Sequence, residues 1–189
     1  MLEELMQLDK EVFLFLNNLG SSEWDTFWMF LTNKWSAIPL YALLLLLSYK
    51  HFGTKKLLFV VITVIVLITA TDQLSNFFKY GIQRLRPCYD PEVSPIMRLV
   101  KGYCGGKFGY FSAHAANTSA LALFFTILLR PYYKFFGIFL IVWAIFVSYS
   151  RIYIGVHFPL DVLSGIGVGL LFGWLFAKLY IFAVYKYGI

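Results

Sequence analysis

Three short segments place ionisable residues directly beside long apolar stretches. They are KYGIQRLRP (79–87), FSAH (111–114) and SRIYIGVHFPLD (150–161). Together they supply several cations, two serines, two histidines and an aspartate. Such residues can hold an oxyanion, provide a histidine nucleophile and transfer protons. We therefore treat the three segments as candidate parts of one active site.

The third segment contains a histidine and an aspartate four residues apart, His157 and Asp161. Pro159 suits the first turn of a helix, which places Asp161 in that turn and His157 just before it. At this spacing the carboxylate can hold one ring nitrogen and leave the other free as a nucleophile. Arg151 adds a planar fork of donors that fits a tetrahedral oxyanion.

The first segment places three polar side chains at helical spacing. Lys79, Gln83 and Arg86 fall at positions i, i+4 and i+7, so a helix that continues to Pro87 would carry them on one stripe. On such a stripe they reach a single ligand. This predicts a cationic wall for the site.

The second segment follows the glycine-bearing stretch GYCGGKFGY and begins another apolar run. Ser112 stands where the N-cap of that helix is expected. A helix start presents free N–H groups and binds anions readily. His114 follows Ser112 by two residues and is placed to move a proton there.

Taken singly, each of these residues has an ordinary structural explanation. Lone cations at a helix end commonly snorkel to the interface, and an isolated His114 is more often a hydrogen-bonded interfacial residue than a catalyst. Asp161 alone would simply favour a helix N-terminus. The chemical interpretation depends on their conjunction, because all three segments meet at helix ends on one membrane face.

The composition indicates what kind of helices must position these residues. Of the 189 residues, 60% are hydrophobic, 20% aromatic and only 14% charged, which indicates an integral membrane protein. Apolar runs of about 20 residues can each cross roughly 30 Å of hydrocarbon. We expect one membrane-embedded domain over 1–189: an all-α, polytopic membrane helical bundle. The predicted crossings are 28–49, 57–78, 115–129, 135–149 and 160–184.

The N-terminal segment has a different character from these runs. Residues 1–19 mix apolar side chains with acidic ones and Lys10, which favours a helix that lies at the membrane interface. The bundle therefore has five crossings, or six if this helix also passes through the bilayer.

Charge in the linkers predicts the orientation. Linkers 50–56 and 130–134 and the tail with Lys186 share one face, and they are short and basic, as is typical of cytoplasmic loops. Residues 79–114 and 150–159 share the other face, which should be periplasmic or exterior. The long loop on that face is basic as well. Either the orientation is inverted, or these cations serve chemistry.

The spacing of the three segments resembles the motifs of the type 2 phosphatidic acid phosphatase family. The matching pattern is Lys79, six residues and Arg86-Pro87; Ser112-x-His114; and Ser150-Arg151, five residues, His157, three residues and Asp161. The second motif departs from the usual Pro-Ser-Gly-His, with Phe111 for proline and Ala113 for glycine. The resemblance covers roughly residues 57–180.

The resemblance implies a role for each motif residue. His157 attacks phosphorus, Asp161 orients it, and His114 serves as acid and base. The phosphoryl oxygens are held by Lys79, Arg86, Ser112, Ala113 and Arg151. No metal or other cofactor is expected, since the segments lack the group of carboxylates that holds magnesium.

The implied substrate is a membrane lipid that carries a phosphate monoester or diphosphate, and no nucleic acid partner is expected. Candidates are phosphatidic acid, phosphatidylglycerol phosphate, a polyprenyl diphosphate and a lipid A phosphate. Two alternatives belong to other classes. One is a vanadium haloperoxidase-like protein, and the other is a catalytically silent lipid-binding or transport protein, for which intramembrane Asp72 is the best indication.

The two cysteines, Cys88 and Cys104, both lie in the loop between the second and third crossings. If that loop is outside the cytoplasm, the compartment is oxidising and the pair should form a disulfide. Closing a loop of roughly 15 residues stabilises the fold by about 3 kcal/mol. We therefore predict a Cys88–Cys104 disulfide, an inner-membrane location and an active site on the outer side.

Overall fold

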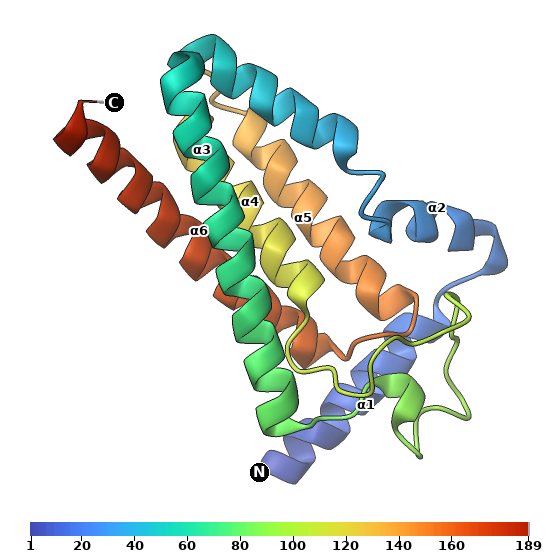
Figure 1. The fold of residues 1–189 in the computed structure, drawn as a ribbon. Coiled ribbons are helices and arrows are strands. Elements are labelled where there is room, and N and C mark those ends of the chain that lie inside the picture. The colour runs from blue at the N-terminus through green and yellow to red at the C-terminus, as the bar shows by residue number, and fades with distance from the viewer. Residues whose placement is uncertain (189) are drawn as a thin grey trace.

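The computed structural model describes residues 1–188, and regular structure within them is helical (Figure 1). One isolated backbone bridge joins Leu85 to Phe108. The helices are α1 (Leu2–Asn18), α2 (Ser22–Thr32), α3 (Ile38–Ile82), the short 3-10 helix η1 (Pro87–Tyr89), α4 (Ala113–Leu129), α5 (Phe136–Tyr153) and α6 (Pro159–Tyr187).

The long helix α3 consists of two halves. At Gly53 the backbone has φ 73° and ψ 177°, so helical geometry is interrupted between 38–52 and 54–82. A positive φ favours glycine, which has no Cβ to clash. In Figure 1 the chain turns back at this point and the second half descends toward the end of the bundle where α4 begins.

Three of the helices, α3, α5 and α6, are long and apolar enough to cross a membrane, and α4 is a shorter apolar helix of 17 residues. The prediction of an all-α membrane bundle is confirmed. The predicted segments 57–78, 115–129 and 160–184 lie inside α3, α4 and α6. The predicted segment 135–149 begins one residue before α5 begins and ends four residues before α5 ends.

The predicted first crossing, 28–49, is wrong at its start, although residues 38–49 lie in α3. Helix α2 ends at Thr32, and the chain turns before α3 begins at Ile38. Asn33 makes the turn: its Oδ1 accepts from Trp35 N at 3.0 Å, and its carbonyl accepts from Ser36 Oγ at 2.7 Å. Such local bonds offer the backbone an alternative to a helix. The apolar segment therefore starts ten residues later than predicted.

Helix α4 lies against α6 through small residues. A Cβ added at Gly165, Gly169 or Gly173 of α6 would lie 2.3–2.5 Å from a backbone oxygen of α4 or of the residue just before it; these oxygens belong to Ser112, Ala116 and Ala120. Three glycines at i, i+4 and i+8 thus let two backbones meet, as in close membrane helix pairs. This contact fixes the start of α4 beside the start of α6.

Helix α1 lies across the ends of the bundle helices, as the interfacial prediction expected (Figure 1). Its buried stripe is Asp9, Phe13 and Asn17, spaced by four residues. The Asn17 amide donates to Tyr153 O at 2.9 Å, and its oxygen accepts from Arg98 N at 2.7 Å. The stripe is therefore polar at both ends and anchors α1 onto the loops around the candidate site.

Candidate active site

The three predicted segments meet at one end of the bundle, where α3 ends, α4 begins, α5 ends and α6 begins (Figure 1). Ser112 is the N-cap of α4, and its hydroxyl accepts from Ala115 N at 3.5 Å. Its backbone N donates to Asp161 O at 2.9 Å. The second and third segments are thus hydrogen-bonded to each other.

The predicted stripe of Lys79, Gln83 and Arg86 on one helix is wrong. Helix α3 ends at Ile82, and Gln83 takes the left-handed conformation (φ 55°, ψ 30°). The next residues pair with the loop instead: Arg86 N donates to Lys107 O at 3.1 Å. Pro87 disfavours helix at the residue before it, and this pairing satisfies the extended backbone. Arg86 therefore reaches the site from a loop.

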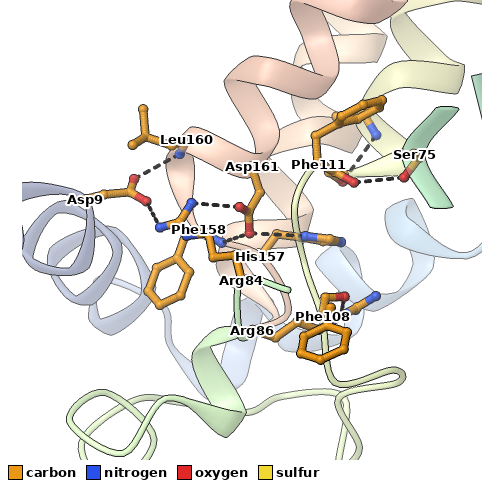
Figure 2. A network of polar contacts seen from close by, with 12 residues as sticks. Asp9, Ser75, Arg84, Arg86, Phe108, Phe111, His157, Phe158, Leu160 and Asp161 are labelled. Atoms are coloured by element: carbon orange, nitrogen blue, oxygen red, sulfur yellow. Dashed lines mark hydrogen bonds and ion pairs between the residues drawn. The ribbon is translucent and has the colours of Figure 1, made fainter. Parts of the chain in front are cut away.

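The predicted contact between His157 and Asp161 is present (Figure 2). Nδ1 of His157 lies 3.5 Å from Oδ2 of Asp161, at ion-pair distance but without a hydrogen bond. Oδ2 also accepts from Phe158 N at 3.1 Å, which fixes it at the first turn of α6. Asp161 is fully buried and His157 is 3% exposed.

Two residues of this network, Arg84 and Asp9, were not predicted as parts of the site (Figure 2). Arg84 Nη1 donates to Asp161 Oδ1 at 2.7 Å, and Nη2 pairs with Asp9 Oδ2. Asp9 Oδ1 accepts from Leu160 N at 2.9 Å. A signal was available, because Asp9 shares a helical stripe with Phe13 and a polar residue on an apolar stripe calls for a buried partner.

The loop before α4 presses against Arg86 and Asp161. Arg86 Nε donates to Phe108 O at 3.1 Å, and Nη1 donates to Cys104 O at 3.0 Å. A Cβ at Gly109 would lie 3.1 Å from Arg86 Cγ and 3.0 Å from Asp161 Oδ2. Gly109, which sequence reasoning passed over, therefore allows the loop to close over the site.

The disulfide partners are the two predicted cysteines. Cys88 and Cys104 are bonded, with their Cα atoms 6.2 Å apart. Cys88 follows the Arg86-Pro87 motif directly, and Cys104 supplies a carbonyl to Arg86. The bridge thus ties both ends of the loop that holds this arginine.

A cavity of about 370 Å³ opens beside Arg151 and His114, with Lys101 and Tyr103 also in its lining. Arg151 Nη1 donates to Thr32 Oγ1 at 2.5 Å, and its Nε is buried without a hydrogen-bond partner. An unpaired guanidinium N–H is costly when buried, and an anionic oxygen would satisfy it.

A second cavity of about 280 Å³ lies on another side of His114, lined also by Ala113 and Asp72. Asn117 Nδ2 donates to Asp72 Oδ1 at 2.8 Å, and Asn117 Oδ1 accepts from Thr71 at 2.5 Å. Asp72 is therefore hydrogen-bonded between α3 and α4 next to the candidate acid.

The electrostatic environment favours a neutral nucleophile. The pKa of His157 lies well below its usual value of 6.5, first because the ring is buried and then because Arg86, Arg151 and Lys79 face it with positive charge. The cations predicted from the first and third segments therefore act on the same imidazole. Within residues 1–188, no three His, Cys, Asp or Glu residues are grouped to hold a metal ion.

Cations, a neutral histidine and a buried carboxylate at the helix ends of an apolar bundle define a membrane-embedded enzyme that acts on an anionic group. The family follows from comparison with known sequences, since the model of the PAP2 superfamily matches residues 53–184. The chain belongs to this family, as its motifs predicted, and is an integral membrane lipid phosphatase.

The chain is 38% identical to the lipid A 4'-phosphatase of Bacteroides thetaiotaomicron, over 93% of its own length and 78% of that protein. It is also 38% identical to the lipid A 4'-phosphatase of Porphyromonas gingivalis, over 96% and 77% of the two chains. The crystal structure of Aquifex aeolicus LpxE superposes with a TM-score of 0.68 at 25% identity, covering 89% of this chain and 93% of that one. The phosphatase interpretation is thereby favoured over the haloperoxidase and silent alternatives.

Proposed function

We propose that this protein removes a phosphate monoester from lipid A or a closely related phosphoglycolipid. Two relatives at 38% identity, each matched over more than nine-tenths of this chain, carry that activity in their names. The structural observation that carries the proposal is the buried pair of His157 and Asp161, with the positive charges of Arg86, Arg151 and Lys79 acting on the histidine ring.

In the first step, Nε2 of His157 attacks phosphorus while the bond from phosphorus to the lipid oxygen breaks. His114 gives its proton to that leaving oxygen, so the lipid departs as a neutral alcohol. Asp161, whose Oδ2 lies 3.5 Å from Nδ1, offsets the charge of the phosphohistidine. Lys79, Arg86 and Arg151 face the negative charge of the transition state.

In the second step, a water molecule attacks the phosphohistidine and the bond from Nε2 to phosphorus breaks. His114, now neutral, takes the proton of that water and is ready for another cycle. The N-cap Ser112 and the following N–H of Ala113 contribute donors to the same phosphoryl oxygens. Inorganic phosphate then leaves through the cavity beside Arg151.

We also propose that the site lies on the periplasmic or exterior face of the inner membrane. The short basic linkers 50–56 and 130–134 are at the opposite end of the bundle, which favours a cytoplasmic location for them. Two cations of the site face have acidic partners on that face: Arg84 pairs with Asp9 and Asp161, and Arg98 pairs with Asp25 at 3.0 Å. These two arginines therefore have a local structural role that does not depend on the orientation of the protein.

The substrate is tested with purified protein and a panel of lipid phosphates: lipid A, phosphatidic acid, phosphatidylglycerol phosphate and a polyprenyl diphosphate. We expect lipid A to lose one phosphate fastest, measured by mass spectrometry of the extracted lipid, and we expect no reaction with His157→Ala. Faster turnover of a glycerophospholipid or a diphosphate would replace lipid A as the substrate class while leaving the phosphatase itself intact.

A further inference from the structure

We propose that Asp9 and Arg84 are positioning residues for phosphoryl transfer. A buried network of ion pairs connects Asp9 of helix α1 to Arg84, and Arg84 to Asp161 beside the nucleophile His157. The proposal rests on the role assigned above to His157. Residues 53–184, which match the family model, do not include α1. Asp9 therefore lies outside the part of the protein that matches the family model, whereas Arg84 lies within it.

The first link is between Arg84 and the carboxylate behind the nucleophile. Arg84 Nη1 donates to Oδ1 of Asp161 at 2.7 Å. The other oxygen, Oδ2, accepts from Phe158 N and lies beside Nδ1 of His157. An arginine bound to one oxygen fixes the rotation of the carboxyl group. Figure 2 shows this division of the two oxygens.

The second link is between Arg84 and Asp9. Arg84 Nη2 pairs with Asp9 Oδ2, while Oδ1 of Asp9 accepts from Leu160 N at 2.9 Å. Asp9 thus holds Arg84 with one oxygen and the first turn of α6 with the other. Arginine alone can make this bridge, because its planar fork presents two N–H groups in fixed directions.

The three residues of this network are buried and closely packed. The side chains of Asp9, Arg84 and Asp161 are 2%, 9% and 0% exposed. The Arg84 guanidinium lies 4.6 Å from the ring centre of Phe158, and Phe13 of α1 packs on the same ring at 5.3 Å. Losing one partner of a buried charge pair leaves the other uncompensated, which is strongly destabilising.

The charges of Asp9, Arg84 and Asp161 link this network to the reaction as well as to packing. Asp161 must offset a positive imidazole ring once His157 carries phosphate. Arg84 by itself would neutralise Asp161, and Asp9 restores one net negative charge to the group of three. Asp9→Asn keeps the size of the side chain but removes that charge, so it should weaken the support for the phosphohistidine.

The test compares Asp9→Asn with Lys10→Met in the purified enzyme. Lys10 is the next residue of α1 and pairs with Asp90 and Glu92 at 3.0 and 2.8 Å, so its loss perturbs α1 docking without touching Asp161. Loss of an outer partner of a metal-ligating histidine typically costs about 10- to 100-fold in activity, and we take the same range for His157. We expect that loss in kcat for Asp9→Asn with KM nearly unchanged, and a much smaller effect for Lys10→Met.

A double variant separates positioning from simple folding. Arg84→Met leaves two buried carboxylates facing each other, whereas Arg84→Met with Asp9→Asn removes both charges and leaves Asp161 alone. We expect the double variant to be faster than Arg84→Met. We also expect the ¹⁵N signals of His157 to shift in Asp9→Asn and to stay in place in Lys10→Met.

The results that would overturn the positioning role differ from those that would overturn the proposed function. Wild-type kcat in Asp9→Asn, equal losses in Asp9→Asn and Lys10→Met, or a double variant no faster than Arg84→Met would overturn the positioning role. Failure of the proposed function would instead appear as a wild-type protein that does not hydrolyse the lipid phosphates. The ¹⁵N shifts of His157 would still test the positioning role of Asp9 in that case.

Discussion

Nη1 of Arg151 lies 2.5 Å from Oγ1 of Thr32, so the last residue of α2 holds the guanidinium that borders the candidate phosphate cavity. Thr32 lies outside the three motifs, at the point where a longer helix was predicted. Because α2 ends at Thr32, before the turn at Asn33, the Thr32 hydroxyl is positioned to accept from Arg151.

The first prediction concerns this contact. Thr32→Val keeps the shape of the side chain but removes the acceptor, and a hydrogen bond to a charged group is worth about 1.5–3 kcal/mol. Because Arg151 should then be poorly aimed at the phosphate, we expect KM to rise roughly tenfold or more. Steady-state kinetics measure the effect. Thr32→Ser, which retains the hydroxyl, is the control, and an unchanged KM in Thr32→Val would remove Thr32 from the site.

The second prediction follows from the low pKa of His157. A pKa well below 6.5 means that the ring stays neutral as the pH falls through 6.5, so the free enzyme keeps its nucleophile in mildly acidic solution. With ¹⁵N-labelled histidine, the chain gives signals from only three histidines, His51, His114 and His157. We expect the signal missing in His157→Ala to titrate below 6.5. A midpoint at or above 6.5 would contradict the environment described for the ring.

The third prediction concerns the type of catalysis. The candidate site presents Lys79, Arg86 and Arg151 to the phosphate, and these cations can offset the transition-state charge without a divalent ion. We expect full turnover in the presence of a metal chelator and inhibition by vanadate, which adopts the five-coordinate geometry of the transition state. Turnover that stops in chelator and returns with magnesium would show that a metal takes part.

The fourth prediction joins the disulfide to the orientation of the chain. If the Cys88–Cys104 loop faces an oxidising compartment, a membrane-impermeant thiol reagent should label intact cells only after reduction. A single-cysteine variant, Cys88→Ser, provides the control, since its remaining thiol should react without reduction. Thiols that react only after cell lysis would place the loop and the site in the cytoplasm.

Sequence reasoning reached the motif residues because their spacing is local. His157 and Asp161 are four residues apart, and a proline-started helix brings them together whatever else the chain does. The same holds for Ser112, whose role as N-cap depends on the helix that follows it. Local spacing and the family resemblance thus sufficed for the centre of the site.

The surrounding residues depend on tertiary contacts that no spacing reveals. Asp9 meets Arg84 across 75 residues of sequence, and Thr32 meets Arg151 across 119. The two errors have the same origin, since Asn33 and Gln83 leave helical geometry where side-chain and loop contacts compete with an apolar run. Apolar periodicity cannot register such competition.

The central claim is that His157 is the nucleophile, and capture of the phosphoenzyme tests it most directly. The purified protein is mixed with lipid A carrying ³²P at the phosphate, quenched within one turnover, and digested for mass spectrometry. We predict an acid-labile, alkali-stable label on His157, absent in His157→Ala. His114→Ala should reduce this label only through slower leaving-group departure, because it removes the acid and retains the nucleophile. Phosphate release at the wild-type rate by His157→Ala, or a label on another residue, would contradict the mechanism.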